Sequence, residues 1–121
     1  MEVQALDVKA NLEKIQANVL ETCQRTNRNP NEITIIAVTK YVSIETAQKA
    51  IAAGIKNIGE NRDRGFLEKW QVIGEQAVWH YIGSLQSRKV KNIIEQVDYI
   101  HSLDRLSLAE EINSRAMTFS K

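Results

Sequence analysis

The sequence has few of the residues that build special sites or mark boundaries. It contains one cysteine, one proline and five glycines in 121 residues. A lone cysteine excludes an internal disulfide framework and a cysteine-rich zinc site. The 16 basic and 15 acidic residues leave a net charge of +1, so no overall field attracts nucleic acid. No apolar run approaches the ~20 residues of a membrane helix, and the first residues are not those of a secretory signal. We therefore expect a cytoplasmic protein without a membrane partner.

The scarcity of proline and glycine also leaves no linker or low-complexity segment, and we expect a single domain over residues 1–121. The chain opens with a helical pattern, because Leu12, Ile15, Val19 and Cys23 recur every three or four residues. Cys23 lies on this apolar stripe and is expected to be packed and unreactive.

Four strand–helix units are expected to follow. The strands are predicted at 33–39, 55–60, 77–82 and 97–103, and the helices at 43–53, 62–70, 87–96 and 105–117. Ser43 is the expected N-cap of the first of these helices and Gly54 the glycine that ends it. The first strand is almost continuously apolar, which suits burial on both faces of a parallel sheet.

Alternating strands and helices predict an α/β fold in which parallel strands are joined by right-handed crossovers. An open doubly wound sheet fits this pattern, and so does part of a TIM-type (β/α) barrel preceded by an N-terminal helix. A whole barrel usually takes ~250 residues, so this chain would supply about four of the eight units. The sequence stops where a fifth strand is expected, which predicts a truncated chain.

In both architectures functional residues gather where strands end and lead into helices. Lys40 follows an apolar strand there. Partial desolvation would favour its neutral amine, which can attack an aldehyde and form a Schiff base. A lysine that simply extends into water is the alternative. After the second strand, Asn61 is expected to cap the next helix or to contact a ligand. Glu60 is expected to pair with a cation such as Lys40 or to face solvent.

Two histidines and one basic run complete the polar candidates. His80 and His101 lie on different strands without a cysteine or carboxylate at a metal-binding spacing, so we expect hydrogen-bonded structural histidines and no metal. The segment 83–87 places backbone N–H groups where an anion could bind. The run 88–91 lacks an aromatic platform, so a solvated helix face is favoured over nucleic-acid binding.

Four motifs at these strand ends resemble those of the pyridoxal phosphate homeostasis protein family, whose barrel is like the N-terminal domain of alanine racemase. They are Ile36-Ala37-Val38-Thr39-Lys40, Gly59-Glu60-Asn61, the segment from Trp79 to Ser87, and Ile100-His101-Ser102-Leu103-Asp104-Arg105. They stand in the family's order and spacing, and the resemblance covers nearly the whole chain as the N-terminal half of such a barrel.

The resemblance implies that Lys40 holds pyridoxal phosphate as a Schiff base and that Asn61 and His80 belong to the cofactor-facing rim. It implies intracellular homeostasis of the cofactor rather than an assigned turnover, and no catalytic residue is predicted. Two alternatives stay open. One is a racemase-like or lyase-like enzyme in which Lys40 abstracts an α-proton, and the other is a non-catalytic interaction module.

Two departures from the family pattern bear on these expectations. Arg62 stands where many relatives have tyrosine, and Arg88-Lys89 replaces an Asn-Lys pair. The phosphate-binding motifs of relatives also lie near the far end of a chain about twice as long, so we expect weak or absent cofactor binding by this fragment. A half-barrel leaves open sheet edges, which predicts self-association.

Overall fold

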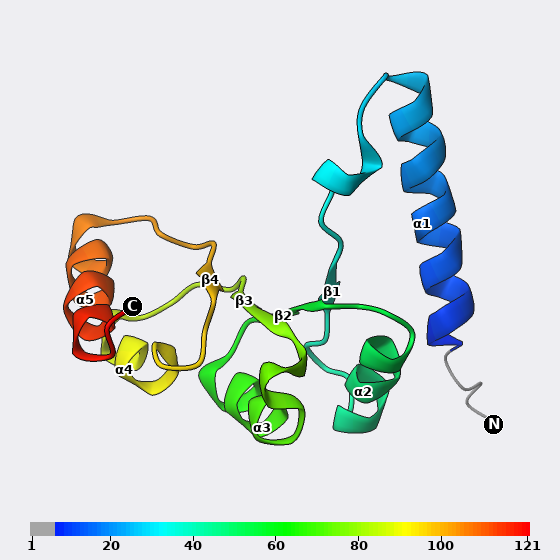
Figure 1. Cartoon of the computed structure of the whole chain (residues 1–121). Coiled ribbons are helices and arrows are strands. Elements are labelled where there is room, and N and C mark those ends of the chain that lie inside the picture. Colours follow the sequence, from blue (N-terminus) through cyan, green and yellow to red (C-terminus); the bar gives the residue numbers. More distant parts are fainter. Residues whose placement is uncertain (1–6) are drawn as a thin grey trace.

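The computed structural model describes residues 7–121 (Figure 1). Its helices are α1 (Val8–Arg25), α2 (Ile44–Ala52), α3 (Asp63–Ile73), α4 (Val90–Ile93) and α5 (Leu106–Thr118), and its strands are β1 (Ile36–Val38), β2 (Asn57–Glu60), β3 (Val78–Tyr81) and β4 (Tyr99–Ile100). Short 3-10 helices cover Pro30–Glu32, Gly74–Gln76 and Ser87–Lys89.

The four strands form one parallel sheet in the order β1-β2-β3-β4. Val38 pairs with Gly59, Gly59 with His80, and His80 with Tyr99. Strands that follow one another in chain order, each separated by a helix, are arranged as in a (β/α) barrel, whereas a doubly wound sheet reverses its strand order. The structure confirms the α/β class and four parallel units after an N-terminal helix, and it favours the barrel alternative.

The core lies between the sheet and the helices on one of its sides. Figure 1 shows α2, α3 and α4 on the same side of the sheet, with α1 and α5 at its two ends. From the strands, Ile58 and Trp79 point into this layer and are almost completely buried. The rings of Phe66 on α3 and Trp79 meet edge to face, with centroids 5.3 Å apart. Side chains of this size contribute about 1.5–3 kcal/mol each when buried, so this layer fixes the helices to the sheet.

The opposite face of the sheet is open along its outer strands. Val38 on β1 is 50% exposed and Tyr99 on β4 is 56% exposed. The expectation that the first strand is buried on both faces is therefore wrong for the described residues 7–121. A parallel strand is buried twice only where helices cover both faces or a barrel closes around it, and here the helices cover one.

The ends of α1 and α2 follow the sequence. Asp7 caps α1 by accepting a hydrogen bond from the Ala10 N–H, and Cys23 on this helix is buried as predicted. Ser43 caps α2 by accepting a hydrogen bond from the Thr46 N–H at 3.1 Å. Gly54 follows α2 with φ +109°, a conformation that favours glycine. None of the helices within residues 7–121 is long and apolar enough to span a membrane.

The outer strands and the helix after β3 are shorter than the sequence predicts. The strands predicted over 33–39 and 97–103 shrink to β1 and β4, which each pair with one neighbour only. The helix predicted over 87–96 is instead a 3-10 turn followed by the single turn of α4. In the centre of the sheet, where each strand has two neighbours, β2 and β3 lie within the predicted ranges.

Candidate functional site

The turn that follows β1 presents Lys40. The Val42 N–H donates to the Thr39 carbonyl at 3.2 Å and closes the turn. Tyr41 has φ +66°, in the left-handed region that few residues with a side chain adopt. Lys40 is exposed, and its Nζ lies 5.7 Å from the centroid of the Tyr41 ring. Among residues 7–121 this Nζ forms neither a hydrogen bond nor an ion pair, so its amine is accessible. The expected partial desolvation of Lys40 is therefore wrong, and the side chain extends into water as the alternative had it.

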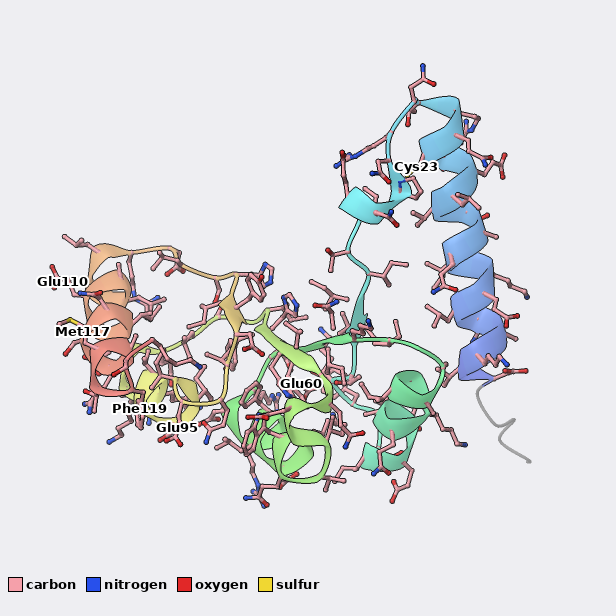
Figure 2. The ribbon with its side chains drawn as sticks, viewed as in Figure 1. Cys23, Glu60, Glu95, Glu110, Met117 and Phe119 are labelled. Carbon is pink, nitrogen blue, oxygen red and sulfur yellow. The ribbon has the colours of Figure 1, made fainter. Side chains whose placement is uncertain are left out.

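A buried polar network lies directly beside this turn. The Thr39 hydroxyl donates to Oε2 of Glu60. Lys69 on α3 donates from Nζ to the same Glu60 oxygen at 3.1 Å and to the Thr39 carbonyl at 2.6 Å. All three residues are buried, and Figure 2 labels Glu60 where the sheet passes over α3. Of the two alternatives expected for Glu60, pairing with a cation is confirmed and facing solvent is wrong, although the cation is Lys69 rather than the suggested Lys40.

Lys40 and Asn61 border one hollow of about 230 Å³ at this end of the sheet. Its remaining lining residues are Tyr41, Glu60, Arg62, Arg64, Gly65, Glu68 and Lys69. The side chains of Arg62 and Arg64 are exposed, and Arg64 pairs with Glu68 at 3.2 Å. Lys69 and Arg64 are paired with the two lining glutamates, so the accessible amine of Lys40 and the guanidinium of Arg62 are the cationic groups that could meet an anionic ligand carrying an aldehyde.

Asn61 contributes to this hollow without capping α3. The N-cap residue of α3 is Arg62, and no side chain caps the helix there. The local preference for Asn61 as a cap was therefore wrong. Its backbone instead packs against Gly83, where an added Cβ would lie 2.8 Å from the Asn61 carbonyl oxygen. This close approach between the ends of β2 and β3 sets the position of Asn61 at the hollow.

His80 lies on the open face of the sheet, apart from the residues that line the hollow. Its Nε2 is 2.9 Å from Oδ1 of Asn57, and its Nδ1 is 2.9 Å from Nε2 of His101. The Tyr99 ring stacks on His80 with centroids 4.7 Å apart. Because an amide oxygen only accepts, His80 donates from Nε2 and accepts at Nδ1 from His101. The expectation of a hydrogen-bonded structural histidine agrees with this arrangement.

The surroundings of His80 favour the neutral form of its imidazole. Burial, and secondly the positive charge that His101 can carry, lower the pKa of His80 below its ordinary value of 6.5. The charge of Asp98 acts in the opposite direction and is the smaller influence. A neutral His80 matches the hydrogen-bond pattern, since a second ring proton would leave two donors facing each other.

The basic run 88–91 does not form a continuous cationic surface. Val90 is fully buried, and Lys89 Nζ lies 3.8 Å from Oδ1 of Asp63. Burial raises the pKa of Asp63, but hydrogen bonds from Asn92 and the Arg64 N–H, together with the charge of Lys89, lower it below its ordinary value. Within the described part of the chain, no group of three or more His, Cys, Asp or Glu side chains could hold a metal ion.

Sequence reasoning missed three residues of these clusters. Lys69 occupies the apolar stripe of α3 with Phe66 and Ile73, and a lysine at that spacing signals a buried partner. Asn57 and Tyr99 lie beside His80 because neighbouring strands are in register. The alternation of side chains along β2 and β4 could have placed both residues on the face of His80. Their contact with His80 also depends on the register between the strands, which the sequence does not show.

No family model matches the chain. It is 37% identical over 106 residues to a pyridoxal phosphate homeostasis protein of Aquifex aeolicus, covering 87% of this chain and 46% of the relative. It is 34% identical over 113 residues to the protein of the same name from Escherichia coli, covering 90% and 48%. The chain thus spans about half the length of these curated relatives.

Most of this chain also matches about half the length of solved structures. PipY of Synechococcus elongatus with pyridoxal phosphate bound matches with a TM-score of 0.70 and 30% identity, over 88% of this chain and 50% of PipY. A protein from Bifidobacterium adolescentis matches with a TM-score of 0.83 over 98% of this chain and 55% of its own. Its 24% identity shows a shared fold alone.

Proposed function

We propose, from the premise that this chain is homologous to about half the length of the pyridoxal phosphate homeostasis proteins, that it binds pyridoxal phosphate and serves the intracellular homeostasis of that cofactor. The observation that carries the proposal is the accessible amine of Lys40, which lacks an ionic partner among residues 7–121 and borders the hollow at the end of β1 and β2. The relatives' name and the cofactor bound to PipY support it.

The residues around the hollow fit the proposed ligand. Pyridoxal phosphate supplies an aldehyde, which condenses with a primary amine to form a C=N bond and one molecule of water. Lys40 would provide the amine, since Lys69 already donates to Glu60 and Thr39 and is buried. Asn61 would orient the ligand from the neighbouring strand. His80 lies farther down the open face, and its role is proposed as support of that face through Asn57 and His101.

The proposal includes weak, reversible binding. Phosphate is held by several charge-assisted hydrogen bonds in most sites, each worth about 1.5–3 kcal/mol. The family resemblance predicts that those donors belong to a part of the relatives that this sequence does not match. We further propose a cytosolic location, which the lone cysteine supports, and self-association through the outer strands.

A titration with pyridoxal phosphate tests the proposal. We expect an absorbance band at roughly 420 nm that saturates with cofactor and is lost in Lys40→Ala and Lys40→Arg. The arginine variant keeps the charge but has no amine able to form the C=N bond. Lys56→Ala, which removes an exposed lysine before β2, is the matched control and should keep the band.

Borohydride reduction followed by peptide mapping identifies the modified lysine. The proposed function predicts label on Lys40 in the wild-type chain and none there when the cofactor is omitted. If the band persists in Lys40→Ala, or if the label distributes evenly over exposed lysines, the proposed site is wrong.

A further inference from the structure

We propose that Lys69 is a positioning residue, which fixes the turn that carries Lys40 through its hydrogen bonds to Thr39 and Glu60. This inference deepens the proposed function and rests on it for the role of Lys40. Lys69 lies in the middle of α3, nine residues beyond Glu60, and only 6% of it is exposed. Its ammonium group connects α3 to the ends of both β1 and β2.

The residue before Lys40 is held through every polar group that it has. The Thr39 N–H donates to the Gly59 carbonyl at 3.1 Å, and the Thr39 hydroxyl donates to Glu60. The Thr39 carbonyl accepts from Lys69 at 2.6 Å and from the Val42 N–H at 3.2 Å. Lys69 therefore acts on the same carbonyl oxygen that closes the turn, and the direction in which Lys40 leaves the sheet depends on it.

The turn needs such support because its conformation is unfavourable. Tyr41, directly after Lys40, has φ +66°, and a residue with a side chain keeps a left-handed conformation only where its surroundings hold it. Without the Lys69 contact, the Thr39 carbonyl could rotate and Tyr41 could return to an ordinary conformation. Lys40 would then move like any exposed lysine rather than remaining at the edge of the hollow.

The stability that the Glu60–Lys69 ion pair provides does not explain why charged residues, rather than apolar ones, lie between α3 and the sheet. A buried ion pair is often no more stabilising than apolar side chains of the same volume, although removing one partner alone is strongly destabilising. Glu60 and Lys69 bury one charge each between α3 and the sheet, where an apolar pair would also pack. What an apolar pair lacks is a donor to the Thr39 carbonyl.

The test compares the reactivity of Lys40 with that of a reference lysine in the same molecule. The probe is salicylaldehyde with cyanoborohydride, which labels amines through an aldehyde but carries no phosphate. Peptide mapping gives the ratio of label on Lys40 to label on the exposed Lys56. We expect Lys40 to be favoured in the wild-type chain, because a fixed turn keeps its amine beside the hollow, where it meets the aldehyde in a productive geometry.

The decisive variant is Glu60→Gln combined with Lys69→Met, which leaves no unpaired buried charge. We expect its melting temperature to stay within a few degrees of wild type and the Lys40:Lys56 ratio to fall on the order of tenfold. Lys69→Arg, which retains donors, should restore most of the ratio. Lys49→Met, at an exposed lysine of α2, is the matched control and should leave it unchanged.

The outcomes separate the two proposals. If the folded double variant keeps the wild-type ratio, or if the wild-type chain shows no preference for Lys40, the positioning role is overturned. If the double variant does not fold, Glu60→Gln with Lys69→Leu, which also lacks a donor for the Thr39 carbonyl, replaces it and is judged by the same ratio. If salicylaldehyde favours Lys40 as expected but pyridoxal phosphate gives no Lys40-dependent band, the proposed function fails while the positioning role stands.

Discussion

At the scale of single residues, the two lysines near Glu60 have opposite environments and therefore opposite capacities. Lys69 is buried and donates to two oxygen atoms. Lys40 is exposed beside it, with its Nζ 5.7 Å from the centroid of the Tyr41 ring. An amine that is already committed to a carboxylate and a carbonyl is not available to an aldehyde, whereas an exposed amine is. The pair thus divides into an accessible lysine and one whose amine is already hydrogen-bonded.

His80 is expected to make the stability of the chain depend on pH. Burial and the charge of His101 lower its pKa below 6.5 in the folded state, whereas the unfolded chain has the ordinary value. Between these two values the unfolded state binds more protons, so the free energy of unfolding rises with pH. The free energy of unfolding therefore has its full value, as far as His80 is concerned, above about pH 6.5, and it decreases as the pH falls toward the folded-state pKa of His80.

Urea unfolding between pH 5 and 8 measures this dependence. We expect His80→Gln to remove most of the slope below pH 6.5 and His101→Gln to remove less, because burial is the larger cause of the shift. The lowered pKa of Asp63 acts below its ordinary value of 3.8, outside this window. An unchanged slope in His80→Gln would show that another group titrates there.

At the scale of the elements, the ends of β2 and β3 are held close together by a residue without a side chain. A Cβ on Gly83 would lie 2.6 Å from the Asn61 Cβ and 2.9 Å from its Cα. Because the obstacle is backbone as well as side chain, the two segments would have to separate. The distance between these loops therefore depends on glycine at this position, and with it the place of Asn61 at the hollow.

Gly83→Ala is expected to destabilise the chain by about 1–3 kcal/mol, the usual cost of forcing extra atoms into packed structure. It should also weaken any Lys40-dependent cofactor band, since Asn61 would move. Chemical denaturation and the pyridoxal phosphate titration measure the two effects. Ser84→Ala, at the exposed neighbouring residue, is the control and should change neither. Wild-type stability in Gly83→Ala would mean that the loops separate without strain.

Features that depend on contacts within one helix could be predicted from the sequence, whereas features that depend on a neighbouring strand could not. Ser43 caps α2, Gly54 follows it, and Leu12 and Cys23 are buried on α1, as the sequence predicts, whereas Ile15 of the same predicted stripe is 49% exposed. The β-branched run 33–39 predicted a long strand from local preference, but only three of its residues found a pairing partner. Strand length depends on what lies beside the strand, which local sequence does not contain.

The candidate site likewise combines residues that the sequence could place and contacts that depend on how separate elements pack. Lys40 and Asn61 could be placed together because parallel strands end at one edge of a sheet. The Glu60–Lys69 pair could not, because the apolar stripe of α3 indicates that Lys69 is buried but not which residue of the sheet it meets. The Asn57–His80–His101 chain depends in turn on the register of three strands. The order of strands and helices thus predicts which residues gather at the edge of the sheet, but it does not predict the side-chain contacts between elements.

The arrangement of the sheet bears on how the whole molecule behaves in solution. β1 and β4 are the outer strands of the four-stranded sheet and each pairs with one neighbour. Unpaired strand edges and exposed apolar side chains, here Val38 and Tyr99, promote pairing with another chain. We therefore expect a dimer or larger assembly, detected by light scattering coupled to size-exclusion chromatography as a molar mass above the 13.8 kDa of the chain.

Substitution at an outer strand distinguishes edge pairing from other contacts. Val38→Lys places a charge on the exposed surface of β1, and charged side chains, lysine above all, are a common means by which edge strands avoid pairing. It should shift the assembly toward monomer while leaving the far-ultraviolet circular dichroism unchanged. Val72→Lys, at a similarly exposed valine on α3, is the matched control and should not. A wild-type chain that stays monomeric at high concentration would show that its edges are protected without a partner. Equal dissociation by both variants would place the contact on apolar surface in general rather than on β1.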